Sequence, residues 1–182
     1  MDDIIIWSRS FDEHLQWLSQ VFQCIRDANL KLKASKCKLF QRKVRFLGHV
    51  VSSDGIEPDP EKVKCVAKRP VPRNISEVQA FVGLASYYRR HVKGFADIVR
   101  PLHELPRKGE PFVWNERRQK AFEVLKCRLV SAPVLAAPLD GGQYILDTDA
   151  SDTGLGAVLQ QEQPDGIRVI AYASRALSNA ET

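Results

Sequence analysis

The sequence predicts an α+β protein in which a helical middle lies between two strand-forming ends. Apolar residues recur at helical spacing over residues 59–105, and helix-capping residues begin these runs. Short apolar or alternating runs, separated by glycine-containing turns, occupy residues 44–51 and 144–173. Strands and helices that are segregated along a chain favour an α+β architecture. The 182 residues, of which 44% are hydrophobic, can bury a sizeable core in one domain or in two small ones.

The N-terminal third is expected to hold short strands around one amphipathic helix. Ser10 and Glu13 form a capping-box pattern, and apolar residues follow them at helical spacing. Short apolar runs bounded by polar residues predict the strands. The expected elements are strands at residues 4–7 and 30–33, a helix over residues 10–28, two strands within residues 44–51 that are bent at Gly48 and His49, and a turn at residues 52–55.

The middle of the chain is predicted to be a small all-helical module. Asp59 followed by Pro60 suits a helix start, because aspartate caps the first turn and proline is tolerated at the first helical position. Ser76 and Gln79 repeat the capping-box pattern, and Gly94 favours a helix end. The expected helices cover residues 59–68, a stretch from about residue 76 to residue 91, and residues 96–105.

Aromatic and cationic residues lie together near the end of the second of these helices, at Tyr87, Tyr88, Arg89, Arg90 and Lys93. One interpretation is that the tyrosines pack in the core while the cations face water. The other is that the group contacts a nucleic acid, whose phosphates attract cations and whose bases stack on aromatic rings. The residues by themselves leave both interpretations open.

The C-terminal third is expected to hold a helix followed by strands that present acidic residues. Asn115 can cap a helix that ends at Pro133, and a turn is predicted at residues 141–142. The predicted strands cover residues 144–148, 155–160 and 169–173, with a turn at residues 150–153. Asp147 and Asp149 stand two residues apart, so strand alternation places them on one face. They could be turn formers, or an acid at this position could hold Mg²⁺.

Composition narrows the class of protein. The sequence has no apolar run of membrane-spanning length and no signal peptide, so an intracellular protein is expected, in either the cytoplasm or the nucleus. Four scattered cysteines favour free, buried thiols over a zinc site. The net charge is +5, and residues 56–108 carry 11 Lys/Arg against 6 Asp/Glu, while residues 109–182 carry 7 against 10. A basic middle suits either a solvated surface or an attraction for phosphate.

Several motifs resemble a known family. TDAS (residues 148–151), followed by GLGAVLQQ and VIAYASRAL, resembles the opening of the RNase H domain in polyproteins of gypsy-type LTR retrotransposons. Asp2 and Asp3 match the two acids of the reverse transcriptase YxDD motif, with Met1 at the variable position. FLGHVVSSDGI (46–56) resembles the primer-grip hairpin, and FVGLASYYRRHVKGFADIVRPLHEL (81–105) resembles the thumb. Residues 112–135 resemble the segment that joins polymerase to nuclease.

The resemblance implies three regions and a set of functional residues. Residues 1–57 would be a partial palm with the primer-grip hairpin, residues 58–108 a helical thumb, and residues 109–182 a connection followed by the N-terminal half of an RNase H-like mixed sheet. The implied catalytic acids and Mg²⁺ ligands are Asp2, Asp3 and Asp149, and no catalytic role is carried onto Asp147. The implied nucleic-acid-binding residues are Phe46, Leu47, Gly48, Tyr87, Arg89, Arg90 and Lys93. The implied partners are an RNA:DNA hybrid, a template-primer duplex, and the upstream and downstream parts of the polyprotein.

The function implied by the resemblance is that of an RNA-directed DNA polymerase with ribonuclease H activity, which transfers phosphoryl groups with two Mg²⁺ ions. The sequence departs from the family because the Tyr of YxDD, an upstream polymerase Asp, and the nuclease Glu and Asp expected beyond Thr182 are absent, and Glu181 is given no catalytic role. We therefore expect a fragment of this enzyme that is inactive alone, and whether the chain is itself an enzyme stays open. The alternatives are a host-retained module that binds nucleic acid without catalysis and a nuclease half completed by a partner chain.

Overall fold

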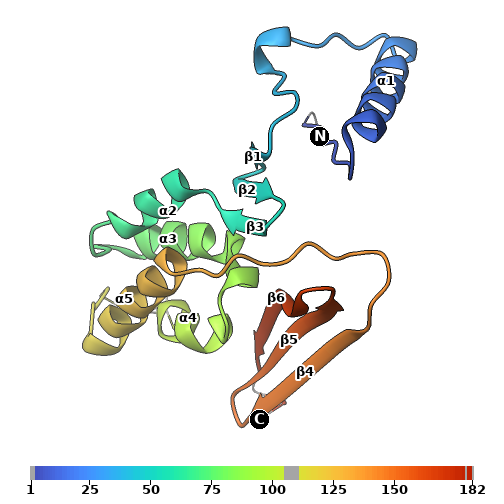
Figure 1. Cartoon of the computed structure of the whole chain (residues 1–182). Helices are drawn as coiled ribbons and strands as arrows, with labels where there is room; N and C mark the ends of the chain where they lie inside the picture. The colour runs from blue at the N-terminus through green and yellow to red at the C-terminus, as the bar shows by residue number, and fades with distance from the viewer. Residues whose placement is uncertain (1–2, 105–110, 179, 182) are drawn as a thin grey trace.

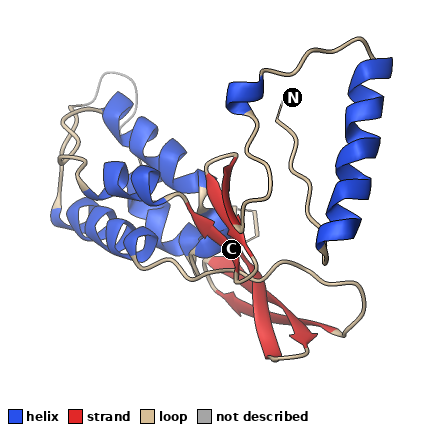
Figure 2. Cartoon of the chain, turned by 45° about the horizontal axis from the view of Figure 1, so that its top comes forward, coloured by secondary structure: helices blue, strands red, loops and turns tan. Residues whose placement is uncertain are grey.

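The computed structural model describes residues 3–104, 111–178 and 180–181, and it contains two three-stranded sheets beside a group of helices (Figure 1). The helices that follow residue 59 lie together beside the strands, while the N-terminal helix stands apart (Figure 2). The helices are α1 (Phe11–Asp27), α2 (Pro60–Ala67), α3 (Ile75–Tyr87), α4 (Phe95–His103) and α5 (Glu116–Val130), with 3₁₀ turns at Ala34–Lys36 and Arg89–His91. The strands are β1 (Lys43–Phe46), β2 (His49–Ser52), β3 (Gly55–Pro58), β4 (Tyr144–Ser151), β5 (Gly154–Gln163) and β6 (Gly166–Ala176).

The α+β class that the sequence predicts is confirmed, and helix α1 begins where its capping box indicated. The Glu13 N–H donates to Ser10 Oγ at 3.2 Å, and the Arg9 N–H donates to the Glu13 carboxylate at 2.7 Å. These bonds satisfy backbone donors that the first helical turn leaves free. Leu18 is the buried residue of α1, whereas Leu15 and Trp17 on the same helix are exposed, so its apolar stripe is only partly covered.

The strands expected at residues 4–7 and 30–33 are wrong. Both segments lack regular secondary structure and belong to no sheet, and the second leads into the 3₁₀ turn Ala34–Lys36. Ile4, Trp7 and Leu30 are exposed. An apolar run becomes a strand only when a neighbouring strand takes up its backbone hydrogen bonds, and none of the described segments pairs with either run.

The hairpin predicted within residues 44–51 is present and gains a third strand. β1 and β2 pair antiparallel from Lys43↔Ser52 to Phe46↔His49. The predicted bend at Gly48 and His49 is one residue too late, because His49 already pairs with Phe46. Leu47 (φ 45°) and Gly48 (φ 68°) form the turn, and two successive positive φ angles suit the twist of a two-residue hairpin. The expected turn at residues 52–55 connects β2 to β3, and β3 itself is a strand that the sequence did not predict. β3 also pairs with a distant segment through two hydrogen bonds, from Ile56 N–H to Leu135 O (2.7 Å) and from Leu135 N–H to Ile56 O (2.9 Å).

The helices share one core. Asp59 caps α2 through the Glu61 N–H (2.9 Å), as predicted. The cap of α3 is Asn74, which accepts from the Glu77 N–H at 2.9 Å, so the capping box assigned to Ser76 is wrong and lies two residues earlier. Asn74 has the extended backbone that a cap requires, whereas Ser76 is already in the first turn.

Helix α5, which Asn115 caps as predicted, packs into the same core as α2, α3 and α4. The rings of Phe81 and Phe122 are 4.6 Å apart, which joins α3 to α5. The part of the chain expected to form the thumb therefore buries its apolar side chains against α5 as well as within itself. The fully or nearly fully buried side chains include Val66, Val78, Phe81, Tyr88, Leu102, Phe122, Leu125 and Leu129.

The C-terminal sheet has the order β4-β5-β6, with β4 at one edge. The strands are longer than predicted, because β4 continues to Ser151 and the turn moves to residues 152–153. Both strand pairs are antiparallel, so the described residues contain no parallel pair of the expected mixed sheet. β6 lies against α4, and the Ala96 N–H donates to Ser174 Oγ at 2.9 Å across this contact.

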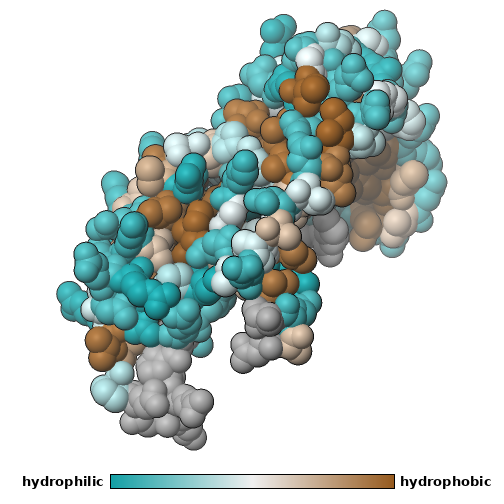
Figure 3. All heavy atoms as spheres, turned by 90° about the horizontal axis from the view of Figure 1, so that it is seen from below, coloured by the Kyte–Doolittle hydropathy of each residue, from teal (hydrophilic) through white to brown (hydrophobic). Residues whose placement is uncertain are grey.

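The expectation of free, buried cysteines is only partly confirmed. The cysteines are free, but their expected burial is wrong: Cys24, Cys65 and Cys127 are exposed and Cys37 is half-buried, because each lies off the buried face of its segment. Among the described residues, no helix combines the length and apolar character needed to cross a membrane. Apolar side chains do reach the surface in several groups between polar ones, as Figure 3 shows for one face.

Candidate nucleic-acid interface

Two tyrosines of the helical unit hold the turn of the β1–β2 hairpin. Tyr87 Oη donates to Leu47 O at 2.6 Å, and Tyr88 Oη donates to Gly48 O at 2.8 Å. These bonds span 40 residues of sequence, so the hairpin turn and the end of α3 form one structural unit. A Cβ at Gly48 would lie 3.1 Å from Tyr87 Cε1 and 3.3 Å from Tyr88 Oη, which shows how closely the turn approaches the rings.

The two tyrosines differ in burial. For Tyr88 this difference decides between core packing and contact with a nucleic acid, the two interpretations that the sequence left open. Tyr88 is 2% exposed and belongs to the helical core, and burial raises the pKa of its hydroxyl. Tyr87 is 53% exposed, with one edge of its ring against the hairpin turn. The packing role therefore applies fully to Tyr88, while Tyr87 keeps a ring surface that is open to a ligand.

The cations of the predicted site follow the tyrosines directly. Arg89, Arg90 and Lys93 lie in and just after the 3₁₀ turn Arg89–His91, and all three are exposed. Within the hairpin, Leu47 is exposed, and Phe46 and Gly48 are half-buried. The structure thus brings Phe46, Leu47 and Gly48 beside Tyr87 and places the three cations on the segment that continues from it.

Two histidines of this unit were missed by sequence reasoning. The His49 and His91 rings stack with centroids 5.5 Å apart, and the His49 ring lies 5.5 Å from Tyr87 and 5.4 Å from Tyr88. Buried His91 donates from Nδ1 to Pro133 O at 3.2 Å, and desolvation by burial lowers the pKa of its ring. A single histidine in a turn gives no sequence signal for such stacking, because its partners lie 38–42 positions further along the chain.

The predicted acids are not brought together. Asp2 lies outside the described residues, and Asp3 is exposed in the extended N-terminal segment. Asp149 is exposed on β4, opposite Gly156, in a part of the molecule remote from the N-terminal segment (Figure 1). Neighbouring Asp147 accepts a hydrogen bond from Gln160 Nε2 at 2.5 Å.

The described residues do not provide a complete Mg²⁺ site. A tightly held Mg²⁺ needs several oxygen ligands in octahedral arrangement, and carboxylates are its usual protein ligands. Among residues 3–104, 111–178 and 180–181, no group of three or more His, Cys, Asp or Glu side chains could hold a metal ion. Asp149 by itself therefore offers one ligand, and we derive no catalytic step through a metal from these residues.

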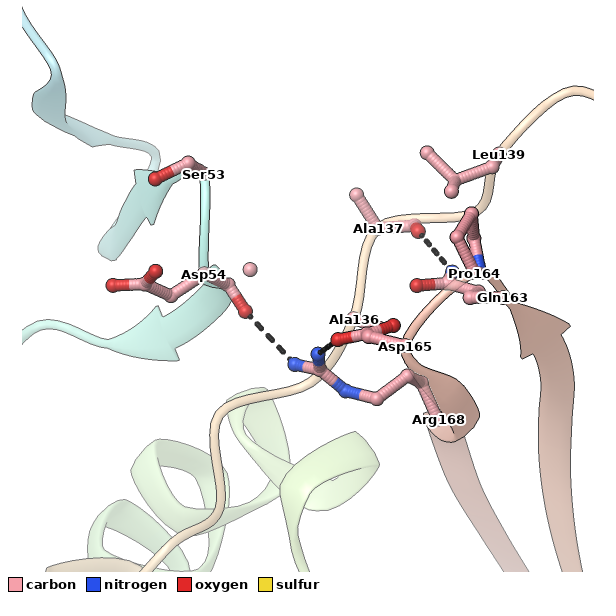
Figure 4. Close-up of a pocket in the computed structure, with 10 residues that line it drawn as sticks. Ser53, Asp54, Ala136, Ala137, Leu139, Gln163, Pro164, Asp165 and Arg168 are labelled. Atoms are coloured by element: carbon pink, nitrogen blue, oxygen red, sulfur yellow. Dashed lines mark hydrogen bonds and ion pairs between the residues drawn. The ribbon is translucent and has the colours of Figure 1, made fainter.

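A cleft of about 280 Å³ lies between the β2–β3 turn, the segment after α5 and the β5–β6 turn of the C-terminal sheet (Figure 4). Arg168 points across it, donating to Asp54 O at 3.2 Å and pairing with Asp165 at 2.5 Å. The amide of Gln163 donates to Ala137 O at 2.9 Å on another side. These bonds join the C-terminal sheet to the β2–β3 turn and to the segment after α5.

Two family models match the chain. The model described as "Reverse transcriptase (RNA-dependent DNA polymerase)" matches residues 1–51. The model described as "RNase H-like domain found in reverse transcriptase" matches residues 114–182. The hairpin turn that Tyr87 and Tyr88 hold lies within the first match, and Asp149 lies within the second.

Curated relatives match the whole chain. The chain is 40% identical over 182 residues to the retrovirus-related Pol polyprotein from transposon 297 of Drosophila melanogaster, and it spans 17% of that polyprotein. It is 38% identical over 194 aligned positions to the Pol polyprotein from transposon gypsy of the same species, of which it spans 18%. It is 34% identical to the transposon Tf2-3 polyprotein of Schizosaccharomyces pombe, of which it spans 14%. The chain thus corresponds to about a sixth of the length of these relatives.

Solved structures share the fold. The foamy viral protease-reverse transcriptase in complex with dsDNA superimposes with a TM-score of 0.82 at 25% identity, covering 97% of this chain and 37% of that one. The same enzyme in complex with an RNA/DNA hybrid gives a TM-score of 0.81 at 25% identity, covering 97% of this chain and 24% of that one.

Proposed function

We propose that the chain binds a template-primer duplex or an RNA:DNA hybrid through the β1–β2 hairpin and the adjoining helices. The premise is that the chain belongs to the family of retrotransposon Pol polyproteins, within their reverse transcriptase and RNase H region. Residues 1–57, 58–108 and 109–182 would act as palm, thumb and connection-nuclease parts of the machinery that copies RNA into DNA. The binding residues in this proposal are Phe46, Leu47, Gly48, Tyr87, Arg89, Arg90 and Lys93.

One observation carries the proposal: the hairpin turn and the cationic 3₁₀ turn are held side by side by Tyr87 and Tyr88. A duplex needs a surface that offers cations to its phosphates and a fixed backbone feature to set its register. The two tyrosine hydroxyls fix the turn, and exposed Arg89 and Arg90 follow within two residues. The complexes of the solved relatives with dsDNA and with an RNA/DNA hybrid agree with such a partner.

For the parent polyprotein we propose polymerase and nuclease activities that use divalent metal. Divalent metal supports both activities in this family, and Asp2, Asp3 and Asp149 are the residues proposed to contribute ligands to Mg²⁺. When bound, Mg²⁺ would stabilise the charge that develops on the attacking and leaving oxygens. Asp149 would present its carboxylate from an exposed strand edge, where a hybrid backbone has access to it.

A second candidate is a module that binds nucleic acid without catalysis. The surface proposed to bind the duplex is built from the hairpin turn and the helical core, and it uses none of Asp2, Asp3 and Asp149. Both candidates require the same duplex-binding surface, so a binding experiment tests what they share.

The test is the affinity of the chain for an RNA:DNA hybrid at low and moderate salt. Replacing Arg89 and Arg90 together by alanine removes up to two phosphate contacts, and we expect affinity to fall about tenfold or more and the salt dependence to become shallower by about one to two units of log–log slope. Fluorescence anisotropy of a labelled hybrid measures both quantities.

The matched control replaces two arginines on another element, Arg117 and Arg128 of α5, which removes the same charge. If this control weakens binding as much as the Arg89/Arg90 variant, the effect reflects net charge and the proposed surface is wrong. Unchanged hybrid affinity in the Arg89/Arg90 variant at low salt would lead to the same conclusion.

A further inference from the structure

The strand that carries Asp149 is linked to helix α4 at the closed end of its hairpin. In the β4–β5 pair, Asp149 lies opposite Gly156, and Ser151 lies opposite Gly154 at the last rung before the turn. Asp149 therefore lies two residues before Ser151, the last paired residue of β4, on an edge strand whose residues are mostly exposed. Whatever fixes the turn contributes directly to the position of the Asp149 backbone.

One guanidinium nitrogen from α4 reaches this turn. Arg100 Nη2 donates to Thr153 O at 2.9 Å and also to Asp97 Oδ1, one helical turn earlier, at 2.5 Å. The Asp97 carboxylate thus orients the Arg100 guanidinium, which donates a hydrogen bond to the turn. Thr153 O also accepts from the Leu177 N–H at 3.0 Å, so the same carbonyl joins the turn to the segment after β6.

The contact leaves little room for a side chain on the turn. Gly154 is buried, and a Cβ there would lie 3.2 Å from Asp97 Oδ1 and 3.2 Å from Arg175 O. The backbone therefore approaches α4 at the position of a glycine. The neighbouring bond from the Ala96 N–H to Ser174 Oγ adds a second anchor from the same helix to β6, at the residue that pairs with Gly156.

From these contacts we propose that Arg100 is a positioning residue for Asp149: it holds the closed end of the β4–β5 hairpin on the helical unit and so orders the strand that presents the acid. The proposal rests on the proposed function in that Asp149 is taken as an acid of the nuclease site. It adds a direct link between the helices that would bind the duplex and the strand that would act on it, in which Arg100 contacts neither substrate nor metal.

The experiment compares three variants of the full 182-residue chain by amide hydrogen exchange. Arg100→Met keeps the apolar stem and removes every donor, whereas Arg100→Lys restores one charged donor group. Because both arginine bonds come from the single atom Nη2, one ammonium group can in principle replace them. Arg117→Met removes an arginine from α5 whose ion pair with Glu104 is long, at 3.8 Å, and exposed, and it serves as the matched control.

We expect Arg100→Met to speed exchange at the Asp149–Gly156 pair and at the turn by about tenfold, the loss that one hydrogen bond to a charged group predicts. Arg100→Lys should bring the rates back to within about threefold of the original, and Arg117→Met should leave them unchanged. Exchange in the core of α3 should stay the same in all three variants. A purely steric role of the arginine stem would leave Arg100→Met like the original chain.

Three results would overturn the inference: no change in Arg100→Met, a change confined to residues 152–153 that does not reach Asp149, or failure of lysine to slow exchange relative to methionine. These results are independent of hybrid binding and cleavage. If the Arg89/Arg90 experiment fails while Arg100→Met loosens the hairpin, the proposed function is wrong and the hairpin anchor stands. If binding behaves as proposed and exchange does not respond, only the role of Arg100 is wrong.

Discussion

His91 is the residue at which folding most clearly opposes protonation. Its ring is buried, stacked on His49 and bonded to Pro133 O after α5, with Arg90 adding unfavourable charge nearby. Burial and these neighbours lower its pKa, although its bond to Pro133 O acts in the opposite direction. The fold around His91 therefore favours a neutral imidazole.

This arrangement predicts that acid weakens the fold before its carboxylates titrate. In the unfolded chain His91 binds a proton at roughly pH 6.5, whereas in the folded chain it does so only at lower pH, so the unfolded state binds more protons in that window. The free energy of unfolding should therefore fall as pH drops below roughly 6.5 and level off below the folded pKa.

Urea unfolding at several pH values measures this dependence. His91→Gln keeps a side-chain amide that can bond Pro133 O but cannot titrate, so its stability should change less between about pH 7.5 and 5.5 than that of the original chain. His103→Gln, at an exposed histidine of α4, is the control and should retain the original dependence. An identical pH profile in His91→Gln and the original chain would show that His91 does not carry the effect.

At the scale of elements, the joint between β3 and the segment after α5 limits what the chain tolerates. Gly55 has φ 131°, and a Cβ there would lie 2.2 Å from Leu135 O. Gly83, in the exposed face of α3, has no atom within 4 Å of the same added Cβ. The backbone and its neighbours thus require glycine at position 55, whereas position 83 has room for a larger residue.

Substituting alanine at these two glycines should therefore change stability in opposite directions. Gly55→Ala breaks the Ile56–Leu135 bridge and strains the backbone, and it should cost about 2 kcal/mol or more. Gly83→Ala should stabilise by about 0.5–1 kcal/mol, because alanine is the better helix former. Urea midpoints of the two variants at constant m-value decide the matter, and a neutral Gly55→Ala would show that the joint can open without cost.

The same scale distinguishes the helical unit from the C-terminal sheet. Residues of α3 lie in the shared core with α5, whereas β4 is an edge strand with exposed residues along almost its whole length. Amides of residues 81–88 should therefore exchange more slowly than those of residues 144–159, and concentrated solutions should self-associate through the open edge. Equal protection of both segments in a monomer would mean that the edge finds another partner.

At the scale of the whole molecule, the acids remain dispersed. Asp3, implied for the polymerase, and Asp149, implied for the nuclease, lie on different segments, and the described residues assemble no three-ligand site around either. Because two-metal phosphoryl transfer needs several carboxylates around its ions, we expect no Mg²⁺-dependent cleavage of RNA in a hybrid and no primer extension by this chain. Cleavage above background that Asp149→Asn abolishes would contradict this expectation and would show that another group completes the site.

Local signals predicted much of the fold. The caps at Ser10, Asp59 and Asn115 were predicted because each bond closes within three residues and depends on little else. The cap of α3 was misplaced because Asn74–Glu77 and Ser76–Gln79 both fit a capping pattern, and only the backbone conformation distinguishes them. The motifs likewise indicated the family, which the matches to Pol polyproteins confirm.

By itself, then, the sequence determined the starts of α1, α2 and α5, the presence of a hairpin within residues 44–51, the α+β class and the family, since each depends on neighbouring residues or on motif identity. The tertiary structure alone decided that residues 4–7 and 30–33 form no strand, that β3 exists, and that Tyr88 is a core residue while Tyr87 keeps an open face. It also decided that Arg100 reaches Thr153, across 53 positions. These outcomes depend on hydrogen-bond partners and packing surfaces that lie far away in the chain, and local patterns contain no information about which distant group will supply them.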